Sequence, residues 1–347
     1  MRKKILISLL LSFFCIYGKT QDIHFSQYHV APLLLNPALS AMFNGDLRAA
    51  LNYKDQWTSF GAGYKTYSFS ADGAIKKNEW SNGFLGIGIN IFNDVAGDAN
   101  MSTTKVLLSI SGIIDIDKSQ QISMGIQGGL GQNSLNPNGL IWDDQYVNGA
   151  YNPGITTAEV IDLTPLYYGD ISAGVSWKYV TGHSTISSYD ASKYDAGIAI
   201  HHVNRPKQSR NLNDEKLYTK FILHSNACIG IKNTRLAFKP GLLVAIQGPS
   251  REIVFGGIMR YRLQEASHFT GYFGDQAIGF GGHYRLNDAF IPSVWYEFSN
   301  FAIGISYDMN LSSLRAASNL RGGMEVSLRF QNPNPFTYKR WSEPSFN

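Results

Sequence analysis

Charged residues are scarce in this sequence. Asp, Glu, Lys and Arg make up 16% of the 347 residues, whereas soluble domains average about 25%. So little charge argues against a soluble enzyme, because a large water-exposed surface would need more. The chain instead contains 34 Gly, 19 Tyr and 20 Phe. This composition is typical of β-barrels that face lipid and carry aromatic girdles at both membrane interfaces.

Cysteine and long apolar runs are also nearly absent. Cys15 lies in an N-terminal leader and Cys228 is the other cysteine, so the mature chain can form no intramolecular disulfide. An exported chain of this size must then be held by its core or by a closed hydrogen-bond ladder. After the leader, no segment reaches the roughly 18 to 20 apolar residues that a transmembrane helix needs.

The leader has the pattern of a secretory signal peptide. Arg2, Lys3 and Lys4 precede a short apolar run over residues 5–17, and a plausible cleavage site lies before Gln21. We therefore predict a cleaved signal peptide over residues 1–20. Its removal also takes away Lys19, which leaves 26 basic and 26 acidic side chains. Overall charge thus favours no nucleic-acid partner.

Apolar residues alternate with small or polar residues through most of the chain. In residues 301–310 the odd positions are Phe, Ile, Ile, Tyr and Met, and the even positions are Ala, Gly, Ser, Asp and Asn. Residues 85–91 and 324–331 follow the same rule. Because successive side chains of a strand point to opposite faces, this pattern predicts lipid on one face and a polar lumen on the other.

We predict an all-β fold, a transmembrane antiparallel β-barrel. The alternating runs number about 14, and single-chain antiparallel barrels require an even number of strands. The barrel is expected over residues 47–331, after an N-terminal segment, 21–46, and before a C-terminal tail, 332–347. The strands are expected near residues 47–57, 63–75, 83–93, 103–115, 121–132, 170–180, 194–203, 217–231, 234–247, 252–263, 277–286, 291–299, 301–309 and 323–331.

A water-soluble β-sandwich or barrel also shows alternation. Its polar face is usually charged and its strands are typically about five or six residues long. Here the polar face is largely Gly, Ser, Ala and Asn, which favours the membrane barrel. Among the connections, residues 133–169 form a polar, turn-rich loop that is long enough to fold over a barrel mouth.

Several motifs resemble one protein family. Those motifs are Phe25-Ser26-Gln27-Tyr28, Leu35-Asn36-Pro37-Ala38, Tyr53-Lys54-Asp55-Gln56-Trp57, a glycine-rich strand leading to Asn93-Asp94 and Gly97, and Tyr307-Asp308 followed by Glu325-Val326-Ser327-Leu328. In this order they resemble the PorP/SprF family, membrane proteins of the type IX secretion and gliding-motility machinery of Bacteroidota. The resemblance covers nearly all of the mature chain. One departure is the absence of a proline near Tyr64, which affects local loop geometry only.

The resemblance implies a non-enzymatic protein of the cell outer membrane. Its expected partners are outer-membrane lipid, a large secreted adhesin-like surface protein, and periplasmic components of the secretion machinery or components linked to peptidoglycan. It implies no metal, nucleotide or catalytic residue. The motif residues that we take as possible contacts are Gln27, Tyr28, Asn36, Pro37, Ala38, Gln56, Trp57, Asn93, Asp94 and Gly97.

Each of these motifs also has a simpler explanation. Asn36-Pro37-Ala38 is a turn by its chemistry, and it either plugs the barrel, shapes a periplasmic contact, or only steers the chain into the first strand. Trp57 is either an interfacial girdle residue or a partner contact.

The remaining candidates for chemistry are weak. The glycine-rich stretches do not open a helix after a strand, so they predict no phosphate site. His201 and His202 are adjacent and would point to opposite faces of a regular strand, so they are not expected to share a metal ion. We therefore predict no catalytic, cofactor or metal site. The alternative function is an outer-membrane porin or solute transporter with a polar lumen, while a hydrolase is suggested only by scattered Ser and His.

Overall fold

The computed structural model describes residues 22–58, 61–77, 79–80, 82–136, 140–158, 163–181, 192–208, 216–264, 276–313 and 315–332. The predicted signal peptide and almost all of the predicted C-terminal tail lie outside these residues. Among the described residues, no helix is long and apolar enough to cross a membrane.

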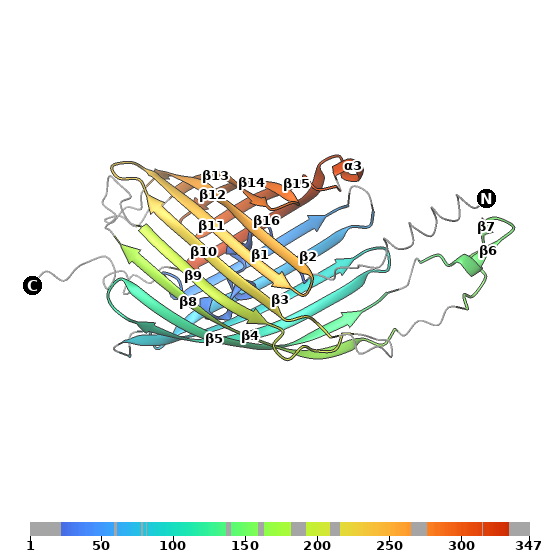
Figure 1. Cartoon of the computed structure of the whole chain (residues 1–347), viewed down its shortest axis with the longest axis horizontal. Helices are drawn as coiled ribbons and strands as arrows, with labels where there is room; N and C mark the ends of the chain where they lie inside the picture. The colour runs from blue at the N-terminus through green and yellow to red at the C-terminus, as the bar shows by residue number, and fades with distance from the viewer. Residues whose placement is uncertain are drawn as a thin grey trace, which may run out of the picture.

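The described residues form a closed antiparallel barrel of 14 strands, which confirms the predicted fold (Figure 1). Each strand pairs with its neighbour in sequence, β5 pairs with β8, and β1 closes the barrel on β16 with Leu47 opposite Asn332. The strands are β1 (Leu47–Gln56), β2 (Tyr64–Ile75), β3 (Gly83–Ala96), β4 (Met101–Asp115), β5 (Gln120–Ser134), β8 (Leu166–Thr181), β9 (Ser192–His201), β10 (Lys220–Gly230), β11 (Leu236–Gln247), β12 (Ser250–Gln264), β13 (Gln276–Arg285), β14 (Ala289–Phe298), β15 (Phe301–Asn310) and β16 (Arg321–Asn332).

The two faces of the wall have the predicted polarity. In β5, the outward side chains of Met124, Ile126 and Leu130 are 65%, 66% and 70% exposed, while Ser123 and Gln127 point inward and are buried. Such an apolar outer surface is stable in hydrocarbon and unstable in water. The wall therefore presents hydrocarbon-like side chains to its surroundings and keeps polar groups in the lumen.

The barrel has two different mouths. The terminal mouth is the end where β1 begins at Leu47 and β16 ends at Asn332. The loop mouth is the opposite end, and it carries the longest connections, residues 135–165 and 202–219. The first of these contains a small hairpin of β6 (Tyr146–Val147) and β7 (Ala150–Tyr151).

That hairpin projects beyond the end of the barrel that carries the short helix α3 (Arg315–Ser318), and it lies away from the wall (Figure 1). The prediction that this connection folds over the mouth is therefore wrong for its described part. The described part of this connection pairs with itself, with Tyr146 opposite Tyr151 and Val147 opposite Ala150, and not with the barrel strands.

Residues 22–46 lie inside the barrel, and we call them the plug. They contain three short helical turns, η1 (Tyr28–Val30), α2 (Pro32–Leu35) and η2 (Pro37–Leu39). Apolar plug residues pack on inward side chains of the wall in one cluster, namely Tyr28, Leu35, Leu39 and Met42 against Ala199, Ile222, Leu243, Ala245 and Val254. The predicted N-terminal segment thus fills the lumen.

Candidate functional site

The plug runs through the lumen from one mouth to the other. The backbone N–H of Asp22 donates to Oε1 of Gln247, the last residue of β11, at the loop mouth (3.0 Å). The backbone N–H of Asp46 donates to the carbonyl of Asn332 at the terminal mouth (3.1 Å). The chain therefore crosses the full lumen before it turns back into β1.

Proline and asparagine set the local path of the plug. Pro32 and Pro37 each occupy the first turn of a short helix, where a fixed φ is favourable and a missing N–H costs nothing. Asn36 lies between them in an extended conformation, and its side-chain oxygen accepts the N–H of Ala38 (2.9 Å). The Asn-Pro-Ala motif is therefore a helix cap as well as a turn.

The same asparagine joins the plug to the wall. Its amide nitrogen donates to the carbonyls of Val175 (3.1 Å) and Ile198 (3.2 Å), on β8 and β9. It also lies 3.1 Å from Nε2 of His224 on β10. Asn36 is fully buried, so these contacts replace the water that its amide would otherwise bind.

Two glycines make this approach possible. A Cβ on Gly174 would lie 2.1 Å from Oδ1 of Asn36, and a Cβ on Gly197 would lie 2.8 Å from Nδ2 of the same residue. Both distances are shorter than any real carbon contact of this kind. The two glycines therefore form a seat for the Asn36 side chain in the wall.

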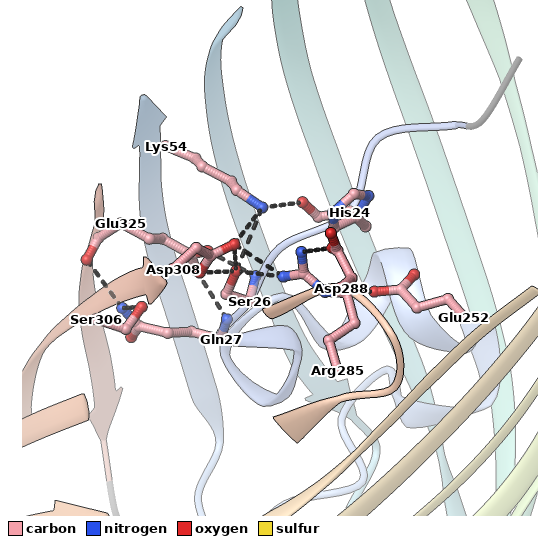
Figure 2. Close-up of polar contacts among 10 residues, drawn as sticks. All are labelled: His24, Ser26, Gln27, Lys54, Glu252, Arg285, Asp288, Ser306, Asp308 and Glu325. Carbon is pink, nitrogen blue, oxygen red and sulfur yellow. Dashed lines mark hydrogen bonds and ion pairs between the residues drawn. The ribbon is translucent and has the colours of Figure 1, made fainter. Parts of the chain in front are cut away.

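The start of the plug is held by two carboxylates, as Figure 2 shows. Glu325 on β16 accepts the backbone N–H groups of Ser26 (2.7 Å) and Gln27 (3.1 Å). Asp308 on β15 accepts the hydroxyl of Ser26 (2.6 Å). The side chain of Gln27 donates to Ser306 (3.1 Å) and accepts from the hydroxyl of another wall residue, Ser327 (2.6 Å).

Cations from the wall balance Asp308. The guanidinium of Arg285 donates to Asp308 (2.9 Å), and Nζ of Lys54 lies 3.6 Å from the same carboxylate. Lys54 also donates to the carbonyl of His24 in the plug (3.1 Å) (Figure 2). Lys54, Asp308 and Arg285 are all buried, and a buried charge is stable only when it is paired and hydrogen-bonded.

A second charged cluster lies at the loop mouth. Asp22 of the plug contacts Nε2 of His202 (3.1 Å) and lies 3.6 Å from Nζ of Lys105. On the wall, Asp170 accepts from Nδ1 of His202 (2.8 Å) and pairs with Lys105 (3.3 Å). The cluster thus joins the plug to the wall through four charged side chains.

The charges of this cluster shift the pKa values of its members. Burial alone would raise the pKa of Asp22, but the charge of Lys105 and the hydrogen bond from His202 hold it well below its ordinary range. For His202, burial alone would lower the pKa, because it also disfavours the charged form of a histidine. The hydrogen bonds to Asp170 and Asp22 instead raise this pKa above its ordinary value. Both shifts favour the ion pair over the neutral pair.

The prediction that His201 and His202 point to opposite faces is wrong. Strand β9 ends at His201, and His202 has a positive φ of 57°, so the regular alternation stops between them. Both rings lie in the lumen with centroids 6.2 Å apart. His201 contacts the carbonyl of Leu35 in the plug (3.2 Å), so both histidines are plug contacts.

Near the terminal mouth, a buried ion pair holds the last part of the plug. Arg48 on β1 donates to both oxygens of Asp72 on β2 (2.9 and 2.7 Å). The same guanidinium donates to the carbonyl of Leu39 (3.0 Å), while Asp72 accepts the N–H of Ala41 (2.8 Å). Backbone donors and acceptors of an irregular segment are thus satisfied by side chains of the wall, as burial away from water requires.

The ten motif residues predicted as contacts fall into two groups. Gln27, Tyr28, Asn36, Pro37 and Ala38 are all buried in the plug. The hydroxyl of Tyr28 donates to Asn226 on β10 (3.2 Å), and burial raises the pKa of this tyrosine.

The other five lie around the loop mouth. Gln56 and Trp57 are at the end of β1, and the Trp57 ring packs edge-to-face on Tyr64 with centroids 5.5 Å apart. Asn93 and Asp94 are near the end of β3, where Asp94 accepts the hydroxyl of Thr66 (2.6 Å). Gly97 begins the next turn with φ of 67°. This group shapes the rim of the loop mouth.

Sequence reasoning did not select as contacts the charged residues that hold the plug, although Lys54, Asp308 and Glu325 stand in the motifs of the family resemblance. The charged residues that hold the plug are Arg48, Lys54, Asp72, Lys105, Asp170, Arg285, Asp308 and Glu325. A signal was present, because each stands at a lumen-facing position of a strand, where a water-filled lumen would not require a charge. Among the described residues, no group of three or more His, Cys, Asp or Glu side chains could hold a metal ion.

Known sequences and solved structures resemble the chain only distantly. No curated protein sequence matches the chain. Solved structures that resemble it include CdiB from Acinetobacter baumannii (8% identity, TM-score 0.38, covering 82% of this chain and 60% of that one). Another is a FadL homologue from Pseudomonas aeruginosa (10% identity, TM-score 0.41, covering 85% of this chain and 92% of that one). A third is the CymD monoaromatic hydrocarbon channel (11% identity, TM-score 0.43, covering 89% of this chain and 94% of that one). The chain spans about 60% of the length of CdiB.

The family comparison is specific. The model of the family described as "Type IX secretion system membrane protein PorP/SprF" matches residues 18–330, which include the plug and nearly all of the barrel. The chain therefore belongs to the PorP/SprF family of type IX secretion system membrane proteins.

Proposed function

We propose that this protein is a non-enzymatic component of the type IX secretion and gliding machinery in the outer membrane. In this role it supports the export or the surface attachment of one large secreted, adhesin-like protein, and it acts through protein contacts. Family membership and the barrel wall support the location and the machinery. The filled lumen is the observation that supports a role in protein contacts.

The orientation follows from general properties of outer-membrane barrels. These barrels have short turns on the periplasmic side and longer loops outside. Here the longest connections, 135–165 and 202–219, are both at the loop mouth. The loop mouth, with its projecting β6–β7 hairpin, would then meet the surface protein, and the terminal mouth would meet the periplasmic components of the machinery.

A porin or solute transporter is the alternative. Such a protein needs a continuous polar path, whereas the plug crosses this lumen and its polar groups are bonded to the wall at both mouths. The buried carboxylates and amides that line the lumen are therefore occupied with the plug and do not face an open pore.

Gene deletion followed by complementation tests the proposal. Deletion should lower the surface level of one large secreted protein and leave uptake of small solutes unchanged, and the wild-type gene should restore the surface level. Unchanged surface display after deletion would contradict the proposal. Loss of small-solute uptake with normal display would favour the porin alternative.

A further inference from the structure

A cavity of about 260 Å³ lies in the lumen between the plug and the wall. On the plug side it is lined by apolar and aromatic residues, including Tyr28, Leu35, Leu39 and Met42. The opposite side is formed by strands of the wall and carries seven charged side chains. The cavity therefore has one apolar face and one ionic face.

The ionic face has an excess of positive charge. Its cations are Arg48, Lys178, Lys239, Arg260 and Arg329, and its carboxylates are Asp195 and Glu297. Glu297 is already shared by Lys239 (2.8 Å) and Arg260 (2.7 Å).

Two of these cations, Lys178 and Arg329, form no direct ion pair with a carboxylate among the described residues, although Asp195 and Glu297 lie in the same lining. A third cation of the lining, Arg48, is paired with Asp72, a residue that does not line the cavity. Lys178 donates to the neutral side chain of Asn44 (2.9 Å). Within the part of the chain that the structure describes, no ion pair joins Lys178 or Arg329 to a carboxylate.

The charged lining lies in the half of the barrel nearest the terminal mouth. Arg48 and Asp195 are close to the starts of β1 and β9, while Lys178 and Arg329 are close to the ends of β8 and β16. These strand ends all lie at the terminal mouth. The side chains of Lys239 and Glu297 are 31% and 19% exposed, so solvent reaches the ionic face.

We propose that this cavity binds an acidic peptide segment presented at the terminal mouth. Two cations without carboxylate partners suit two carboxylates, and a guanidinium such as that of Arg329 can bind a carboxylate through two parallel hydrogen bonds. The apolar plug face would take aliphatic or aromatic side chains of the same segment, which a small inorganic anion lacks. The cavity volume is slightly below the range of small-molecule pockets, so only a short stretch of the peptide would enter it.

Binding of a labelled hexaglutamate peptide to the purified full-length protein in nonionic detergent tests the proposal. Fluorescence anisotropy should show saturable binding that weakens with added salt. Arg329→Gln and Lys178→Gln should each weaken binding about fivefold or more, since one unit charge at 4 Å is worth about 1 kcal/mol even in bulk water. Lys118→Gln is the matched control, because Lys118 is exposed in the turn between β4 and β5 at the same mouth but outside the cavity.

A gain of affinity provides a test that misfolding cannot imitate. Glu297→Gln removes a carboxylate from the lining and should tighten hexaglutamate binding. Each variant is compared only when heat-modifiable migration on a gel shows that it is folded. If Glu297→Gln does not fold, the comparison of hexaglutamate affinity between Arg329→Gln and Lys118→Gln decides the test. Absence of wild-type binding, or equal binding by all variants, would overturn the proposal. Competition by inorganic phosphate at the same concentration as the peptide would overturn the assignment to a peptide. These outcomes do not depend on which protein is exported.

Discussion

Asn36 is the residue that most closely links the local sequence of the plug to the wall. Its side chain is fully buried and contacts Val175, Ile198 and His224 as well as Ala38. Replacing it with alanine removes these bonds and leaves the buried N–H of Ala38 without its acceptor. A buried hydrogen bond contributes about 1 kcal/mol net, so Asn36→Ala should lower the free energy of unfolding by about 2 to 4 kcal/mol.

Chemical denaturation of the protein in detergent measures this effect. Asn300→Ala is the control, since Asn300 lies in the turn between β14 and β15 and should change stability by less than about 0.5 kcal/mol. Equal stabilities of the two variants would show that Asn36 does not hold the plug.

Gly174 supplies a second prediction, because its lack of a side chain is required by Asn36. A Cβ at this position would lie 2.1 Å from Oδ1 of Asn36 and 3.0 Å from the carbonyl of Ile198. Gly174→Ala should therefore be strongly destabilising in the wild type and much less so in the Asn36→Ala background. A double-mutant cycle measures this coupling. Additive effects would contradict the seat formed by Gly174.

Residue chemistry predicted the turn at Asn36-Pro37 but not its surroundings. Proline and asparagine encode a local path, which the structure confirms. The partners of Asn36 lie 139 to 188 positions away in sequence, and no local pattern specifies them. The motif by itself therefore fits a plug and a simple connection equally well. Only the closed barrel, which surrounds the segment, distinguishes the two.

At the scale of elements, alternation predicted all 14 barrel strands, and most bounds differ by only one to three residues. The largest shift at a strand start is in β8, which begins at Leu166 instead of 170. Residues 166–169 show no apolar alternation, yet their backbone continues the ladder, with Leu166 opposite Asn133. Hydrogen bonding to a long neighbour extends a strand beyond its side-chain pattern.

The outer face of β5 supplies a test of lipid contact. Ile126 is 66% exposed in the middle of the strand, and Ile116 is 54% exposed in the turn before it. Arginine on the lipid face costs about 2 to 4 kcal/mol at the bilayer midplane and about 0 to 1 near the interface. Ile126→Arg should therefore lower folding stability in lipid vesicles by the larger amount and Ile116→Arg by the smaller. Similar small effects at both positions would indicate a water-exposed wall.

The start of the plug should respond to pH through His202. Its pKa is raised in the folded protein by Asp170 and Asp22, so its contribution to stability is complete below about pH 6.5, the unfolded value, and is lost as the pH rises through the folded pKa. The pKa of Asp22 is lowered, so its contribution is lost only at pH values well below its ordinary range.

The difference in unfolding free energy between wild type and His202→Gln isolates this contribution. It should be largest near pH 6 and should shrink towards pH 9. His24 and His29 have pKa values lowered by burial and act with the opposite sign, but they are present in both proteins and cancel. A difference that grows as the pH rises would contradict the protonated state of His202.

At the scale of the whole molecule, the composition and the alternation of apolar with polar residues predicted a membrane barrel. The order of the motifs along the chain indicated its family. They did not predict that the N-terminal segment fills the lumen. The charges that hold it, such as Lys54, Asp308 and Glu325, come from the first strand and the last two, and their meeting depends on barrel closure. The wall residues that hold the plug therefore meet only in the closed barrel, where they contact the plug as well as each other.

Ion conductance of the wild-type protein in planar lipid bilayers tests the filled lumen most directly. A variant lacking residues 22–46, shown to be folded by heat-modifiable migration, serves as the control for insertion and should conduct. The account predicts that the wild type stays silent under the same conditions. Stable conductance steps from the wild type would contradict it, because they would require an open path where residues 22–46 lie.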